Sequence, residues 1–197
     1  MKRVSVIGGS CTGKTTLSRE LAQRLGVPHI ELDSLHHDAG WQEAPAEVLQ
    51  ARVDAALAAA PDGWVADGNY HHKIGTSVVE RADTVVLLDL SQRVALRRVL
   101  LRTAGRIISR KELWNGNRES LRLVLSRDSV VWWVIRQHGT YEKKWMPRLE
   151  PLTHLSVVRL RSPREVRAWV HSIQPTESMS GSSKGSDRQK TPPLAET

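Results

Sequence analysis

The sequence predicts an α/β fold in which helices cover both faces of a parallel β-sheet. Short apolar runs alternate along the chain with longer stretches whose apolar residues recur at helical spacing. The run "TVVLL" at Thr84–Leu88 shows no polar alternation, as expected of a strand that is buried on both faces. The first apolar run ends in the glycine pair Gly8 and Gly9, shortly before a helical stretch. These three observations together favour repeated strand–turn–helix units.

Five apolar runs are the expected strands. Because parallel strands end at one edge of a sheet, and ligands bind there, residues that follow the strands are candidates for a site. Gly8, Asp33, Asp67 and Asp89 each follow such a run. We expect strands at Arg3–Ile7, His29–Leu32, Trp64–Ala66, Thr84–Leu88 and Leu155–Leu160.

Five stretches are the expected helices. In the first, three leucines recur at helical spacing before Gly26 ends the helix. In the last, Ser162 is the expected N-cap, because Pro163 suits the first helical position. The stretch that contains "VVWWVI" fits either a buried helix or a strand. The helices are expected at Lys14–Leu25, Pro45–Ala60, Val94–Ile108, Ser126–Gln137 and Pro163–Ile173.

Length and composition are those of one globular domain. The chain has 197 residues, of which 40% are hydrophobic and 25% charged, so it can bury a core. No apolar run approaches the length of a membrane span, and the run after "MKR" meets glycines too early for a signal peptide. The single cysteine, Cys11, excludes an internal disulfide. We therefore expect a cytoplasmic monomer with no membrane partner.

Positive charge is concentrated in one segment. The formal net charge is +8, and residues 93–127 hold ten basic residues against Glu112 and Glu119, so this segment alone carries a net +8. An ordinary solvated helix face mixes both signs. The concentration points to a polyanion, either nucleotide phosphates or a nucleic-acid backbone. The basic residues are Arg93, Arg97, Arg98, Arg102, Arg106, Arg110, Lys111, Arg118, Arg122 and Arg127.

The last part of the chain differs in composition. From residue 174 onward, Ser, Gly, Pro and mixed charges replace the apolar residues. Such a segment cannot bury enough surface to offset the entropy of ordering it. We expect one domain over residues 1–173 and a disordered tail over residues 174–197.

The glycine-rich segment matches the phosphate-binding P-loop, G-x-x-x-x-G-K-[ST]. Glycines let the backbone N–H groups close around a phosphate, and the following helix adds its positive end. Lys14 is expected to bridge the β- and γ-phosphates of ATP, the Thr15 hydroxyl to ligate Mg²⁺, and Thr16 to approach the α-phosphate. The residues expected to bind the nucleotide are Gly8, Gly9, Ser10, Cys11, Thr12, Gly13, Lys14, Thr15 and Thr16.

Three aspartates complete the expected site. Mg²⁺ needs a carboxylate at a neighbouring strand end. Asp67 is preferred, because in the strand order 2-3-1-4-5 of P-loop folds the third strand lies beside the first. Asp89 is expected to be a structural strand-end residue. Asp33 either orients or deprotonates an acceptor hydroxyl or holds a loop, and we list it as a catalytic candidate.

With these residues placed, the chain resembles the nucleoside-monophosphate-kinase group of P-loop kinases, which includes adenylate kinase. It resembles more closely the small bacterial adenylate-kinase-like proteins called DNA topology modulation or AAA-type proteins. The resemblance covers residues 1–173 and rests on "GGSCTGKTT", "ELDSL", "VADGNY", "RADTVVLLDL", "LWNGNRES" and "VVRLRSPREV". It implies a three-layer P-loop fold, an acceptor-side segment at about 33–60 and a helical, arginine-bearing lid at about 103–127.

The resemblance also implies roles for the arginines. The offsets from Asp89 place Arg98 against adenine and Arg102 against phosphate. Arg118, Arg122 and Arg127 are the lid candidates for the transferring phosphoryl group, with Arg118 first, since guanidinium groups neutralise its spreading charge. The stretch around Ser162 resembles the loop that cradles adenine. Where the group has an arginine that grips the acceptor phosphate, this chain has "DGNYHHK", and Lys73 is the only nearby cation in that stretch.

Histidines and tryptophans are the remaining unusual residues. The pairs His36–His37 and His71–His72 are expected to contact the acceptor or occupy polar loops, since their spacing fits no standard zinc pattern. Trp132 and Trp133 are expected in the core. Trp41 and Trp114 either stack on a base or pack beneath the lid.

These features predict a kinase that uses ATP and Mg²⁺ as cofactors. It would pass the γ-phosphoryl group to a small-molecule acceptor, with a nucleotide as the first candidate and a sugar or another metabolite as alternatives. The rival hypothesis is an ATP-dependent nucleic-acid-binding protein, in which the basic segment grips the phosphate backbone. Arginines at lid spacings, without the interleaved aromatics of a single-strand binder, favour the kinase. A plain ATPase stays open as a third reading.

Overall fold

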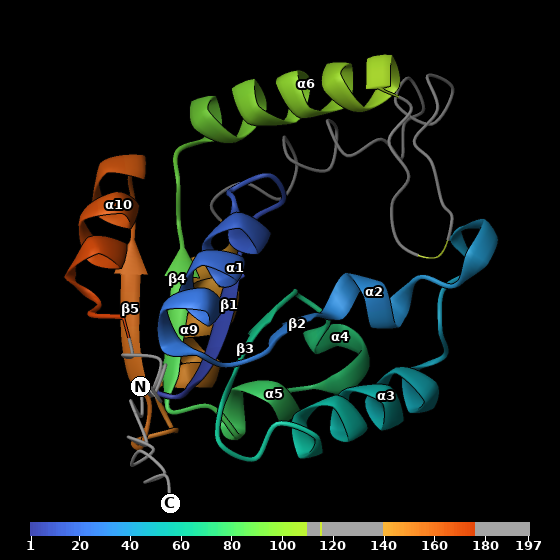
Figure 1. Cartoon of the computed structure of the whole chain (residues 1–197), viewed down its shortest axis with the longest axis vertical. Helices are drawn as coiled ribbons and strands as arrows, with labels where there is room; N and C mark the ends of the chain where they lie inside the picture. The colour runs from blue at the N-terminus through green and yellow to red at the C-terminus, as the bar shows by residue number, and fades with distance from the viewer. Residues whose placement is uncertain (110–114, 116–139, 176–197) are drawn as a thin grey trace, which may run out of the picture.

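The computed structural model describes residues 1–109, 115 and 140–175 (Figure 1). Five parallel strands form one sheet in the order β2-β3-β1-β4-β5, so the predicted fold class and strand order are confirmed. The strands are β1 (Arg3–Gly8), β2 (His29–Glu31), β3 (Trp64–Asp67), β4 (Thr84–Leu88) and β5 (Ser156–Leu160).

The helices follow the predicted alternation. The longer ones are α1 (Lys14–Leu25), α3 (Ala46–Ala58), α6 (Gln92–Ser109), α9 (Thr140–Leu149) and α10 (Pro163–Ser172). Short helical turns connect the strands on the β2–β3 side: α2 (Leu32–His36), the 3₁₀ turn η1 (Ala39–Trp41), α4 (His71–Ile74) and α5 (Ser77–Glu80). The predicted element Ser126–Gln137 lies outside the described residues, and so does the tail from residue 176.

Three strand ends differ from prediction at the carboxyl edge of the sheet, where β1 extends by one residue to Gly8. β2 stops at Glu31, and Asp33 lies in the first turn of α2 instead of after a strand. The Ser34 hydroxyl donates to the Glu31 carbonyl oxygen over 2.7 Å, a side-chain bond that competes with strand pairing. β3 reaches Asp67, because this residue still pairs with both neighbouring strands. The short helices α2, α4 and α5, the 3₁₀ turn η1 and the helix α9 were not predicted.

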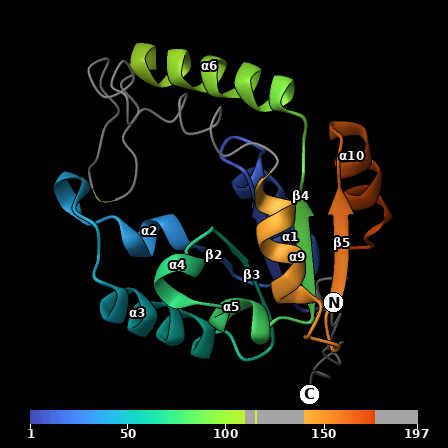
Figure 2. The same cartoon turned by 180° about the vertical axis from the view of Figure 1, so that it is seen from behind.

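Helices cover both faces of the sheet. On one face, α1 and α10 pack on β1, β3 and β4, through a cluster that includes Leu21, Val170 and Val6. On the other face, Trp145 and Leu149 of α9 pack on Ile7 and Leu87 (Figure 2). Burial of each such side chain contributes about 1.5–3 kcal/mol. The sheet is therefore the rigid centre of the molecule.

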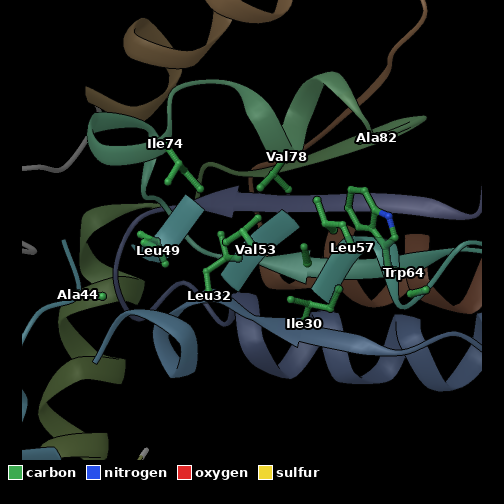
Figure 3. Close-up of a cluster of buried hydrophobic side chains, with 12 residues drawn as sticks. Ile30, Leu32, Ala44, Leu49, Val53, Leu57, Trp64, Ile74, Val78 and Ala82 are labelled. Atoms are coloured by element: carbon green, nitrogen blue, oxygen red, sulfur yellow. The ribbon is translucent and has the colours of Figure 1, made fainter. Parts of the chain in front are cut away.

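A separate cluster supports the β2–β3 edge. Leu49, Val53 and Leu57 of α3 pack with Trp64, which is only 2% exposed, and with the short helices α4 and α5 (Figure 3). This cluster carries the segment that was expected to face the acceptor. Beyond the carboxyl ends of the strands, α6 crosses above the sheet (Figure 1). In the part of the chain that is described, no helix has the length and apolar character needed to cross a bilayer.

Candidate active site

The glycine-rich loop joins β1 to α1, as the motif requires. Gly8 ends β1 with φ +151°, and a Cβ there would lie 2.5 Å from the Leu88 carbonyl oxygen, so a larger residue cannot be accommodated. Gly13 precedes α1 in the left-handed region, with φ +95°. The Thr12 hydroxyl donates to the Gly9 carbonyl oxygen over 2.8 Å and closes the turn. The first turn of α1 contains no acidic residue, so its positive end is not neutralised locally.

Lys14 turns back over the loop. Its Nζ donates to the carbonyl oxygens of Gly8 and Gly9, over 3.1 and 3.0 Å. Burial lowers the pKa of the Lys14 ammonium below its usual value, while the carboxylates of Asp33 and Asp67 oppose that shift. A phosphate group would supply a stronger partner than two carbonyls. The lysine therefore lies where an anion in the loop would be stabilised.

Thr15, Asp67 and Glu31 bring oxygen atoms together below the loop. The Thr15 hydroxyl donates to Asp67 Oδ2 over 2.7 Å and lies 3.4 Å from Glu31 Oε1. Asp67 is 3% exposed, and its second oxygen, Oδ1, lies 3.0 Å from His29 Nε2. Among the residues that are described, no group of three or more His, Cys, Asp or Glu is arranged to hold a metal by itself. A Mg²⁺ ion that also takes phosphate oxygens needs only one or two carboxylates, and these oxygen ligands fit it.

Asp33, in the first turn of α2, contacts the segment that follows β3. Its Oδ1 accepts a hydrogen bond from the Tyr70 hydroxyl over 2.7 Å. Burial, together with this carboxylate, raises the pKa of Tyr70, which keeps the hydroxyl protonated and able to donate. Asp33 also lines the cavity beside the loop.

A cavity of about 750 Å³ opens over the loop. Arg98 and Arg102 of α6 form one wall, and Pro163 and Arg167 of α10 form another. Arg98 Nη1 donates to the Thr12 carbonyl oxygen over 2.5 Å, so this arginine holds the loop as well as lining the cavity. The remaining lining residues are Ser10, Cys11, Thr12, Gly13, Lys14, Thr15, Thr16, Leu17, Arg19, Glu20, Glu31, Asp33 and Val166.

Ser162 has a structural function at this edge. Its hydroxyl accepts from the Glu165 N–H over 3.2 Å and donates to Glu165 Oε1, while Glu165 Oε2 accepts from the Arg161 N–H. These bonds form a variant of the capping box, in which the glutamate accepts from the N–H of the residue before the N-cap, and the predicted N-cap of α10 is present. Ser162 is not among the residues that line the cavity; the adjacent Pro163 is.

The other candidate residues do not line the cavity or lie outside the described residues. Asp89 pairs with Arg159 over 3.5 Å, in line with its expected structural role. His36 is buried, with its ring 4.4 Å from that of Tyr70, and Lys73 binds Glu43 over 2.9 Å. The lid candidates Arg118, Arg122 and Arg127, and the tryptophans Trp114, Trp132 and Trp133, lie outside the described residues.

Four residues at the site were missed by the sequence analysis. Asn69 forms a two-way bond with Gly8: its Oδ1 accepts from the Gly8 N–H over 3.3 Å, and its Nδ2 donates to the Gly8 carbonyl oxygen. Tyr70, Glu31 and His29 contact the two aspartates and Thr15 as described above. Asn69 and Tyr70 follow Asp67 in "VADGNY", so their place directly after a strand could have indicated them. Glu31 and His29 lie within a strand, where no local pattern marks them.

Comparison with known proteins supports the fold. A family model described as an AAA domain matches residues 3–32, which span β1 to β2. No curated protein matches the chain. The structure resembles shikimate kinase from Bacteroides thetaiotaomicron, with a TM-score of 0.52 and 16% identity, over 87% of this chain and 95% of that one.

A second similar structure is shikimate kinase from Acinetobacter baumannii in complex with shikimate. The TM-score is 0.52 and the identity 16%, over 88% of this chain and 90% of that one. At such low identity the likeness concerns the fold. This chain has the five-stranded parallel fold, with order 2-3-1-4-5, of P-loop kinases such as shikimate kinase.

Proposed function

We propose that this chain is a phosphotransferase that moves the γ-phosphoryl group of ATP to a small acceptor. One observation carries the proposal: the P-loop residues Lys14 and Thr15 line one cavity with Asp33 and with the arginines of α6. Asp67, at the end of the neighbouring strand, accepts a hydrogen bond from the Thr15 hydroxyl over 2.7 Å. Phosphoryl transfer depends mainly on positioning and charge neutralisation, and this arrangement supplies cations and hydrogen-bond donors on several sides of one space.

The donor nucleotide would lie over the loop, from Gly8 to Thr16. Backbone N–H groups and the positive end of α1 would hold the phosphates. Lys14 would leave the carbonyls of Gly8 and Gly9 for the β- and γ-phosphates; Asn69 would still donate to the Gly8 carbonyl. Arg102 would reach phosphate. Arg98 would flank adenine while it holds the Thr12 carbonyl.

Thr15 and Asp67 would hold Mg²⁺, with Glu31 close by. When bound, the ion neutralises charge on the phosphate oxygens and helps to fix their orientation. Oxygen ligands of this kind are what Mg²⁺ prefers.

The acceptor would bind on the side of α2 and α3. For an acceptor that reacts through a hydroxyl, Asp33 would accept a hydrogen bond from that hydroxyl, orient it toward the γ-phosphoryl group and take its proton as the new bond forms. Tyr70 would hold the carboxylate in place through its 2.7 Å bond. Arg118 and Arg122 are proposed to neutralise the transferring group from the lid, as guanidinium groups do in related chemistry.

A nucleotide remains the first acceptor to test, because of the adenylate-kinase-like motifs. Two observations widen the search to other hydroxyl compounds. The acceptor-side cations Arg52 and Lys73 are each paired with a carboxylate, Asp38 and Glu43 respectively, both over 2.9 Å. One structure of similar fold is a shikimate kinase in complex with shikimate.

A coupled ADP-release screen tests the proposal. Nucleoside monophosphates, nucleosides and sugars are each offered with MgATP, and Lys14→Ala is the control for contaminating kinases. We expect acceptor-dependent ADP release by the wild type that the variant lacks. ADP release at the same rate without any acceptor would indicate a plain ATPase and contradict the transfer function.

A further inference from the structure

Asp67 is held from two sides, by Thr15 of the P-loop and by His29. It ends β3 between β1 and β2, opposite Val6 and Glu31 in the sheet register. Its Oδ2 accepts from the Thr15 hydroxyl over 2.7 Å, and its Oδ1 lies 3.0 Å from His29 Nε2. Since a carboxylate oxygen only accepts, Nε2 carries the proton in this bond. Asp67 Oδ2 therefore faces the P-loop, whereas Oδ1 binds His29.

The carboxylate needs such a second contact. Rotation of an aspartate carboxylate about its last side-chain bond is soft, so one hydrogen bond does not fix its plane. Asp67 is 3% exposed, and water is therefore scarce as a substitute partner. A buried charge that is not hydrogen-bonded is costly. His29, with a side chain 15% exposed, meets this need from the neighbouring strand.

Glu31 likewise has one oxygen near Thr15 and the other on a basic side chain, but both contacts are longer than those of Asp67. It lies two residues after His29, so both side chains project from the same face of β2. One of its oxygens lies 3.4 Å from the Thr15 hydroxyl, and the other pairs with Arg19 over 3.2 Å. The Arg19 side chain is 64% exposed, and ion pairs with exposed partners contribute little. The bond between His29 and Asp67 is therefore buried, whereas the comparable pair of Arg19 and Glu31 is exposed on the arginine side.

We propose that His29 is a positioning residue for the divalent cation: by holding Asp67 Oδ1, it directs Oδ2 toward the Thr15 hydroxyl and the cation that accompanies ATP. This inference rests on the proposed function. Residues that orient a metal-binding carboxylate typically change metal affinity 10- to 100-fold when lost. His29 acts through Asp67, so its loss should weaken cation binding while nucleotide binding without metal is kept.

The test measures Mn²⁺, used as a paramagnetic substitute for Mg²⁺. The full chain is loaded with a non-hydrolysable ATP analogue, and free Mn²⁺ is followed by electron paramagnetic resonance. His29→Leu removes the donor, whereas His29→Gln restores an N–H at about the distance of Nε2. Arg19→Leu is the matched exposed contact, and His154→Leu, whose Nε2 lies 3.1 Å from the Glu80 carbonyl oxygen, is a control distant from the loop. Analogue affinity is measured separately in EDTA.

We expect His29→Leu to weaken Mn²⁺ binding about ten-fold and His29→Gln to recover most of that affinity. Arg19→Leu should change the Mn²⁺ affinity less than three-fold, and His154→Leu should leave it unchanged. Mn²⁺ affinity within two-fold of the wild type in His29→Leu would overturn the inference. So would an equal loss of analogue affinity in EDTA, which would mark His29 as a structural residue.

Two further results keep the inference testable on its own. If His29→Leu does not fold, His29→Asn replaces it, because its shorter amide cannot reach Asp67; equal Mn²⁺ affinities of the Asn and Gln variants would then overturn the inference. Failure of the wild type to bind the analogue both in EDTA and with Mn²⁺ present would contradict the proposed function itself. Normal analogue binding with unchanged Mn²⁺ affinity contradicts only the role of His29.

Discussion

The proposed donor side and the proposed acceptor side of the site use their charged residues differently. On the donor side, Lys14 is held by backbone carbonyls, and Arg98 and Arg102 line an open cavity. On the acceptor side, Lys73 and Arg52 bind Glu43 and Asp38. Phosphates can replace backbone carbonyls as partners at little cost, whereas an acceptor anion would have to compete with a carboxylate for each of these two cations.

Under the proposed function, this difference gives each side a separate role. The donor side offers positive charge to a polyanion. The acceptor side offers a carboxylate, Asp33, which one hydrogen bond from Tyr70 orients. Such a pair suits a hydroxyl that must lose a proton better than it suits a phosphate that must be gripped. The predictions below test this division.

The largest effect is expected from Lys14→Ala. Loss of the ammonium removes the cation nearest to the β- and γ-phosphates, so phosphoryl transfer should fall below detection, by more than about a hundred-fold. The fold should persist, because Lys14 contacts loop carbonyls and not the core. Turnover is measured by ADP release, and folding by circular dichroism. Retained turnover in the folded variant would refute the donor-site assignment.

Asp33→Asn should lower turnover without lowering ATP affinity. The amide cannot take a proton, so turnover should fall by about 10²–10⁴-fold, the usual contribution of a general base. ATP affinity should change little, because the donor contacts remain. Tyr70→Phe removes only the 2.7 Å hydrogen bond and should cost less than Asp33→Asn. Isothermal titration with an ATP analogue and steady-state kinetics are compared for each variant. A parallel loss of ATP affinity and turnover would place Asp33 on the donor side.

A smaller effect concerns stability and pH on the acceptor side. Burial of His36, together with the nearby cation Lys73, lowers the pKa of its ring. The unfolded chain binds this proton near pH 6.5, whereas the folded chain does not, so folding stability should fall as the pH drops below about 6.5. His36→Gln should flatten that slope by up to about 1.4 kcal/mol per pH unit. Urea unfolding from pH 7 to 5, with His154→Gln as the control, measures it; identical slopes would count against the assignment.

The smallest effect is expected from removal of residues 174–197. Their composition offers little apolar surface to the core. A chain that ends at Ile173 should keep its kcat, KM and melting temperature. Loss of more than a few-fold in turnover would show that the tail takes part in the reaction.

The donor side could be predicted from sequence because its determinants are local. The P-loop spacing places Lys14 and Thr15 at the start of a helix, and the strand order then brings Asp67 beside them. The N-cap at Ser162 is likewise marked by a short-range signal, the proline that follows it. Local determinants of this kind need no knowledge of distant contacts.

The acceptor side could not be predicted in the same way, because its contacts join distant parts of the chain. Tyr70 meets Asp33, and Lys73 meets Glu43, across β2, α2, α3 and β3. Lys73 is the cation of the "DGNYHHK" stretch, but its partners Glu43 and Ala44 are brought to it only in the folded chain. The role of His29 could not be predicted for the same reason, because its bond to Asp67 joins two strands that are separated by α3 in sequence.

The most direct test of the account is the binding of ATP in the presence of Mg²⁺, followed by isothermal titration calorimetry. The account predicts one site per chain in the wild type, with binding that weakens when Mg²⁺ is removed and is strongly reduced in Lys14→Ala. Absence of measurable binding of both ATP and GTP to the folded wild-type protein would contradict it.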